Sequence, residues 1–178
     1  MRRPLLLLCA IAPLSASCRT TARVGDLTAG SVEVRSASGT SHGTLSLEQT
    51  GDGVRLRGAL ARLQPGVHGI HFHQVGRCDA PDFASAGPHF NPTNALHGLQ
   101  NPLGPHAGDL PNITVNAAGE AAVDLTTTRA TADPSSPRGL FGGDGTALVL
   151  HADPDDQHTD PAGNSGARIA CGVVRRAP

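Results

Sequence analysis

The fold is decided by two segments, Ser31-Val32-Glu33-Val34-Arg35 and Thr44-Leu45-Ser46-Leu47-Glu48. In each segment apolar and polar residues alternate, which is typical of a strand with one buried face. Turn signals at Ser38-Gly39, Gly51-Asp52-Gly53 and Pro65-Gly66 leave only a few residues between the first strands. Such short connections favour antiparallel hairpins.

The same alternation predicts further strands at 53–60, 67–74, 113–115, 121–127, 146–151 and 168–174. No long segment has the 3.6-residue period of an amphipathic helix, so we predict an all-β fold, a β-sandwich or flattened antiparallel barrel. Two connections, 76–111 and 152–167, are unusually long and rich in His, Asp, Pro and Gly. Long loops in compact domains are commonly functional, so we expect both to be ordered site loops.

Length and charge limit the class of protein. A chain of 178 residues suits a single domain. It contains no lysine and carries a formal net charge of -1 with neutral histidines. That balance disfavours nucleic acid as a partner, because binding to phosphates depends on an excess of cations.

The N-terminus indicates export. Residues 1–17 are predicted to be a signal peptide, because two arginines precede an apolar run that ends at Leu14 and is too short to span a bilayer. The run leads through small residues to Cys18, in a pattern that resembles a bacterial lipobox with Cys18 lipidated, although Leu14 lies one position too early for it. Ordinary signal-peptidase cleavage just before Cys18 stays an alternative. Residues 18–29 are predicted to be a flexible tether and residues 30–178 the folded domain, in the periplasm or anchored to a membrane as a lipoprotein.

Two cysteines, Cys78 and Cys171, remain for the folded domain once Cys9 leaves with the signal and Cys18 is set aside. In an exported protein such a pair predicts a disulfide. Two buried free thiols are the alternative interpretation.

The histidines are the candidate metal-binding residues of the sequence. In His71-Phe72-His73 the two imidazoles lie on one face of a strand, and Phe72 is expected to point into the core. His151 closes a later predicted strand. Nitrogen and carboxylate donors, a combination that suits zinc, gather in the first long loop. These donors are His89, His97, His106 and Asp109.

Four stretches, in order over residues 30–174, together resemble the copper-zinc superoxide dismutase family. They are Gly69-Ile70-His71-Phe72-His73, Ser85-Ala86-Gly87-Pro88-His89-Phe90-Asn91-Pro92, His106-Ala107-Gly108-Asp109-Leu110 and Gly163-Asn164-Ser165-Gly166-Ala167-Arg168-Ile169-Ala170-Cys171-Gly172. The resemblance implies a Greek-key barrel of eight antiparallel strands, copper and zinc as cofactors, and dismutation of superoxide to dioxygen and hydrogen peroxide. The insertion 78–83 is similar to the bacterial branch of the family.

The resemblance also implies a role for each site residue. The copper positions match His71, His73, His89 and His151. The zinc positions match His89, His97, His106 and Asp109, so His89 is expected to bridge both metals and to supply a proton for peroxide. Arg168 matches an arginine that orients superoxide beside the copper. Asp155 matches a carboxylate that hydrogen-bonds ligands of both metals, with its neighbour Asp156 as a competing assignment.

Some features depart from the family pattern or match no ligand position. Asp153, Asp155, Asp156 and Asp160 make the second long loop acidic, so we expect weak electrostatic steering of superoxide. We expect His42 and His158 to face solvent and His68 to hydrogen-bond within the fold. The rival functions are a non-catalytic copper or zinc carrier and a purely structural sandwich. The sequence does not distinguish a monomer from a homodimer.

Overall fold

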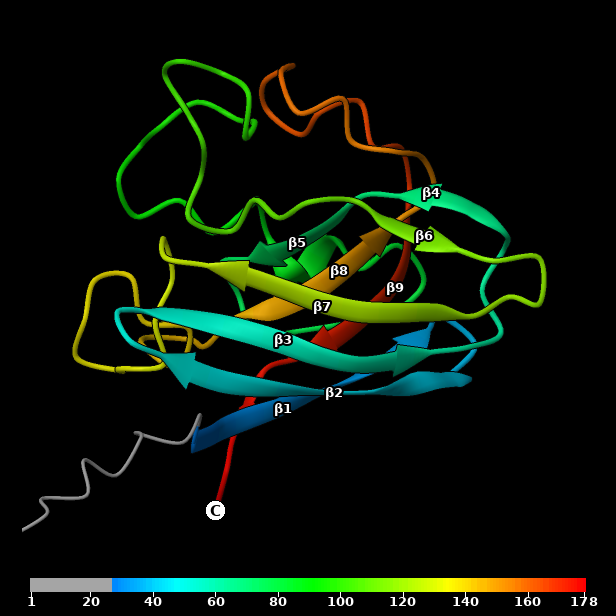
Figure 1. Cartoon of the computed structure of the whole chain (residues 1–178), viewed down its shortest axis with the longest axis horizontal. Helices are drawn as coiled ribbons and strands as arrows, with labels where there is room; N and C mark the ends of the chain where they lie inside the picture. Colours follow the sequence, from blue (N-terminus) through cyan, green and yellow to red (C-terminus); the bar gives the residue numbers. More distant parts are fainter. Residues whose placement is uncertain (1–26) are drawn as a thin grey trace, which may run out of the picture.

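A computed structural model describes residues 27–178 of the protein (Figure 1). The predicted signal peptide, Cys18 and most of the predicted tether lie outside the described residues. Strand β1 begins at Leu27, three residues before the predicted start of the domain.

Within the described part of the chain the structure is built almost wholly from strands. They are β1 (Leu27–Ser36), β2 (Ser41–Thr50), β3 (Gly53–Leu60), β4 (Gly66–His68), β5 (Ile70–His73), β6 (Ile113–Val115), β7 (Ala121–Thr127), β8 (Ala147–His151), β9 (Arg168–Val173) and β10 (Arg175–Arg176). One 3-10 turn, η1 (Ala84–Ala86), follows the disulfide cysteine of the first long loop. No helix in residues 27–178 has the length and apolar character needed to span a membrane.

The strands form a curled antiparallel sheet in the order β5-β8-β9-β1-β2-β3-β7, with β10 paired to β1. Neighbours such as β3 and β7, or β5 and β8, are far apart in the chain, as in a Greek key. Strands β4 and β6 form a separate two-stranded sheet. The predicted all-β antiparallel fold is therefore confirmed.

Alternation along β1 and β2 buries one face of each strand. Val32, Val34, Leu45 and Leu47 are each at most 1% exposed and pack in one core, while Glu33 between them is exposed. Burial of aliphatic side chains of this size contributes about 1.5–3 kcal/mol each. This core supports the strands that carry the site.

The segment 67–74, predicted as one strand, forms two strands in the structure. The expected strand 67–74 divides at Gly69, because β4 pairs with β6 whereas β5 pairs with β8. Both backbone groups of Gly69 are hydrogen-bonded: its N–H donates to Asp153 O at 2.9 Å, and its carbonyl accepts from His151 N at 2.9 Å. The break joins the strand to the second long loop.

The two long loops lie together at one end of the sheet, seen in Figure 1 as the green segment after β5 and the orange segment after β8. Backbone bonds connect them: Gln100 N donates to Gln157 O at 3.1 Å. The side chain of Asp160 also accepts from His97 N at 2.7 Å. The loops are thus ordered against each other above the strands.

Candidate metal centre

Three histidines are held by two paired strands. In β5 the side chains of His71 and His73 share one face, while Ile70 and Phe72 enter the core. Strand β8 pairs with β5 and ends at His151, whose ring centroid lies 4.9 Å from that of His71 and 5.7 Å from that of His73. The predicted face of β5 is confirmed.

The first long loop returns along the free edge of β5. Phe72 N donates to Gly108 O at 2.9 Å, and Phe72 O accepts from Phe90 N at 2.8 Å. These bonds bring His89 beside His73 and Asp109 beside His71, each as a bridge partner. A side chain at position 108 would meet Phe72 O at 2.3 Å, so the loop can approach this closely only because Gly108 has none.

Four nitrogens converge as a first donor group, which we call the four-histidine set: His71, His73, His89 and His151. Their candidate donor atoms lie within 4.8 Å of one another. Four buried nitrogens in it have no hydrogen-bond partner, namely Nδ1 of His71 and Nε2 of His73, His89 and His151. Unpaired buried polar atoms are costly, so their convergence fits a cation with nitrogen ligands.

The second ring nitrogen of each strand histidine fixes its orientation. His71 Nε2 donates to Asp155 Oδ2 at 2.7 Å, and His73 Nδ1 donates to Gly87 O at 2.8 Å. His151 Nδ1 donates to Gly166 O at 3.3 Å. With these protons placed, the inward nitrogens keep their lone pairs for a metal.

Burial keeps His73, His89 and His151 neutral. Desolvation, with repulsion from neighbouring rings, lowers the pKa of His73 to about 2 and that of His151 to about 3. Desolvation lowers the pKa of His89 to about 4, although the hydrogen bond to Asp109 opposes this. All three are therefore free bases at neutral pH, the form that binds metals.

A second donor group, the mixed set, consists of His89, His97, His106 and Asp109. The Nδ1 atoms of its three histidines lie 2.9, 3.1 and 3.3 Å from Asp109 Oδ1. A zinc ion held about 2.0–2.1 Å from each donor in a tetrahedron needs donor atoms about 3.3 Å apart. The mixed set has this spacing, so it fits zinc.

Charge in the mixed set is balanced around Asp109. Although burial raises it, hydrogen bonds from His106, His89 and His97 hold the pKa of Asp109 far below its usual range. Desolvation lowers the pKa of His97, but its bonds to Asp109 and Asp155 prevail and raise it to about 9. His97 is thus cationic at neutral pH when no metal is bound.

Asp155 connects the two sets. It is 3% exposed, and its Oδ1 accepts from His97 Nε2 at 3.0 Å while its Oδ2 accepts from His71 Nε2. Its backbone N–H and carbonyl are both hydrogen-bonded to the side chain of Asn112. Asp156 is exposed and bonds only within its own loop, to His158, Thr159 and Asn164. The geometry therefore favours Asp155 over Asp156 as the carboxylate shared by both sets.

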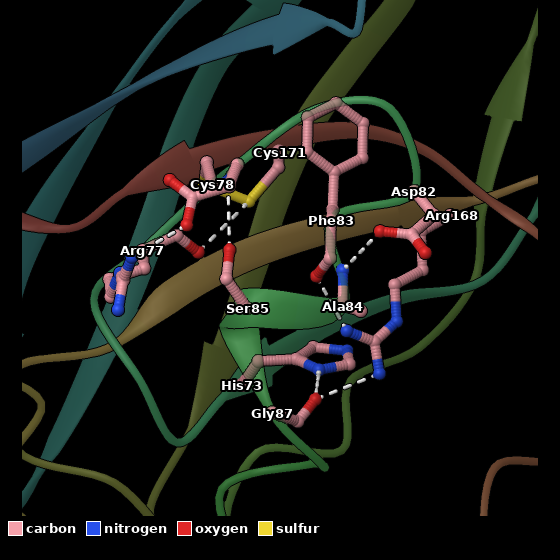
Figure 2. Close-up of a disulfide and its surroundings, with 11 residues drawn as sticks. His73, Arg77, Cys78, Asp82, Phe83, Ala84, Ser85, Gly87, Arg168 and Cys171 are labelled. Atoms are coloured by element: carbon pink, nitrogen blue, oxygen red, sulfur yellow. Dashed lines mark hydrogen bonds and ion pairs between the residues drawn. A yellow bond between two sulfur atoms is a disulfide. The ribbon is translucent and has the colours of Figure 1, made fainter.

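Arg168 lies at the edge of the four-histidine set. Its guanidinium donates to Phe83 O at 2.7 Å and to Gly87 O at 2.8 Å, the carbonyl that also accepts from His73 (Figure 2). Partial burial lowers the pKa of Arg168, while Asp82 opposes this. The guanidinium remains charged at any ordinary pH and has unused N–H donors.

The predicted disulfide is confirmed: Cys78 and Cys171 are bonded, with Cα atoms 5.7 Å apart. Figure 2 shows it at the base of the segment that carries Phe83 and Gly87 to Arg168. The bond therefore ties this segment to β9, the strand that begins with Arg168.

Of the three histidines that match no ligand position, two lie as predicted and one does not. His158 is exposed, as predicted, and His68 is hydrogen-bonded through both ring nitrogens, to His151 O and Gln64 O. The prediction for His42 was wrong: it is 8% exposed, and its Nδ1 bonds to Ala61 O at 3.0 Å. The pairing of β2 with β3 brings this carbonyl to it.

Comparisons with known proteins agree with this geometry. Residues 41–174 match the family model described as copper/zinc superoxide dismutase (SODC). The chain is 47% identical over 134 residues to superoxide dismutase [Cu-Zn] 1 of Aquifex aeolicus (strain VF5), covering 75% of this chain and 79% of that protein. It is 40% identical over 144 residues to superoxide dismutase [Cu-Zn] of Caulobacter vibrioides (strain ATCC 19089 / CIP 103742 / CB 15), covering 80% and 83%.

Solved structures extend the match to the fold. A double mutant of a SOD-like protein from Bacillus subtilis aligns with a TM-score of 0.79 at 39% identity, covering 83% of this chain and 98% of that one. The chain belongs to the copper/zinc superoxide dismutase family.

Proposed function

We propose that this protein dismutes superoxide to dioxygen and hydrogen peroxide, with copper held by the four-histidine set and zinc by the mixed set. The observation that carries the proposal is that both sets are complete and share His89, whose Nε2 is unpaired in one set while its Nδ1 lies 2.9 Å from Asp109 in the other. An imidazole between two divalent cations can bind through both nitrogens because the cations stabilise its anion.

Copper, when bound, supplies the one-electron chemistry by accepting an electron from one superoxide and giving an electron to the next. The protein binds and orients the anion. The Arg168 guanidinium, fixed by two carbonyls, offers its remaining N–H donors and its charge to superoxide beside the four-histidine set.

The protein also supplies a proton. Formation of hydrogen peroxide from superoxide consumes two protons, and we assign one of them to His89 Nε2, because this nitrogen faces the four-histidine set and has no competing partner there; the second comes from solvent. Asp155 accepts hydrogen bonds from the outer nitrogens of His71 and His97, which orients the other nitrogen of each ring toward the donor set to which it belongs.

Metal content, copper spectroscopy and activity test the proposal together. The purified protein should bind one copper and one zinc and should dismute superoxide. His89→Ala should lose zinc affinity and change the electron paramagnetic resonance spectrum of copper. His158→Ala, at an exposed histidine, serves as the matched control. A protein that holds both metals but lacks dismutase activity would instead be a metal carrier.

We further propose that the protein acts outside the cytoplasm, in the periplasm or anchored to a membrane through a lipid on Cys18. The Cys78–Cys171 disulfide supports an oxidising compartment. Palmitate labelling in a bacterial host should mark the wild type and not Cys18→Ser, whereas export of both without label would favour ordinary cleavage. Sedimentation at several concentrations tests the homodimer.

A further inference from the structure

The three histidines of the mixed set differ in what their outward-facing Nε2 atoms contact. His97 Nε2 donates to Asp155 at 3.0 Å, and His89 Nε2 faces the four-histidine set. His106 points its Nδ1 inward, 3.3 Å from Asp109 Oδ1, so its Nε2 is turned outward. The carboxylate near this outward nitrogen is that of Asp160, whose Oδ1 lies 3.8 Å away.

Asp160 is already anchored against the first long loop. Its Oδ1 accepts the backbone N–H of His97 at 2.7 Å. One carboxylate oxygen thus lies between the main chain of one mixed-set residue and the ring of another. The side chain of Asp160 is 46% exposed and that of His106 only 7%, and both line a pocket of about 330 Å³ that opens to solvent.

Zinc chemistry requires a proton on the outward nitrogen of His106. A neutral imidazole that binds a metal through Nδ1 carries its hydrogen on Nε2. Histidines that bind metals almost always donate this N–H to a carboxylate, a carbonyl or water, which orients the ring and makes it a stronger ligand. At 3.8 Å the contact with Asp160 is longer than a hydrogen bond.

We propose that Asp160 is a positioning residue for zinc, acting through His106 as Asp155 acts through His97. This inference rests on the proposed assignment of the mixed set to zinc. Asp155 and Asp160 both belong to the loop 152–167, whereas His97 and His106 lie in the loop 76–111. Zinc binding would therefore draw the two loops together through two carboxylates.

The test compares Asp160→Asn with Asp144→Asn. Both remove one negative charge, and Asp144 is exposed in the connection before β8. Asparagine at 160 keeps an oxygen that can accept from His97 N, so the loop contact is preserved while the charge is lost. We expect zinc affinity, measured by competition with a chelator, to fall about 10- to 100-fold in Asp160→Asn and to change less than twofold in Asp144→Asn.

A second measurement separates positioning from loop packing. With Co²⁺ in the zinc site, proton magnetic resonance should resolve the exchangeable Nε2 hydrogens of His97 and His106. In Asp160→Asn the hydrogen of His106 should exchange with solvent at least tenfold faster, because the pocket admits water. The hydrogen of His97, held by Asp155, should keep its rate.

Unchanged zinc affinity in Asp160→Asn would overturn the inference, and so would equal acceleration of both hydrogens, since that would reflect general loosening of the loops. Failure of the wild-type protein to bind zinc or Co²⁺ at all would overturn the proposed function together with the inference. A fault in the inference alone appears only in the variant.

Discussion

Removing the disulfide should cost the metal-free protein about 4.6 kcal/mol of unfolding free energy. The perturbation is Cys78→Ala combined with Cys171→Ala. Cys171 is 2% exposed and packs among Phe83, Ala86 and Val149, so alanine is preferable to serine, whose hydroxyl would be buried there.

The magnitude follows from the length of the loop that the bond closes. Cys78 and Cys171 are 93 residues apart. In the chain-entropy treatment, a cross-link over that separation lowers the entropy of the unfolded chain by an amount equivalent to about 4.6 kcal/mol at 25 °C. Single domains are commonly stable by about 5–15 kcal/mol, so the variant should be much weaker and still able to fold.

Guanidinium unfolding of the metal-free proteins, fitted to two states, measures the difference. Wild-type protein in reductant is the control and should lose a similar amount. A loss below about 1 kcal/mol would refute the reasoning, because it would mean that the unfolded chain gains little freedom from the broken bond. With metals bound, kcat/KM should also fall, since the segment that positions Arg168 loses its tie to β9.

Three further outcomes are expected. Arg168→Ala should lower kcat/KM about 10- to 100-fold, because it removes the free energy of one or two hydrogen bonds from a charged group to superoxide. Arg168→Lys should restore part of the lost kcat/KM, and stopped-flow rates equal to wild type in Arg168→Ala would contradict this role. Because the raised pKa of His97, about 9, leaves it protonated at neutral pH, zinc binding should release about one proton there, and affinity should rise as pH approaches 9. Calorimetry in buffers of different ionisation enthalpy counts the proton, and a count near zero would be inconsistent. Raising ionic strength from low to physiological should lower kcat/KM well under tenfold, because Asp153 and Asp156 are exposed on the loop that carries the site; a tenfold drop would show strong steering.

Strands were predictable where one face is buried along their length. The predicted bounds 53–60, 113–115 and 121–127 match β3, β6 and β7. The break at Gly69 could not be foreseen, because alternation shows which face is buried and not which strand is the partner. The change of partner comes from the loop after β8, which is far away in the sequence.

The donor sets could be anticipated from residue type and family motifs, but their orientation could not. Which nitrogen of each ring faces inward depends on acceptors such as Gly87 O, Gly166 O and Asp155, which are brought in by tertiary contacts. The same holds for Asp160, which in the sequence is one of several acidic loop residues. Only the pairing of the two loops distinguishes it.

Phe72 belongs to two systems at once: its ring is fully buried in the core, and its backbone N–H and carbonyl hold the returning loop through Gly108 and Phe90. Anyone who redesigns this protein for heat resistance would therefore find that repacking around that ring also retunes the metal ligands on either side of it. Hydrophobic substitutions there should be screened by metal affinity as well as by melting temperature, since a gain in one property can be a loss in the other.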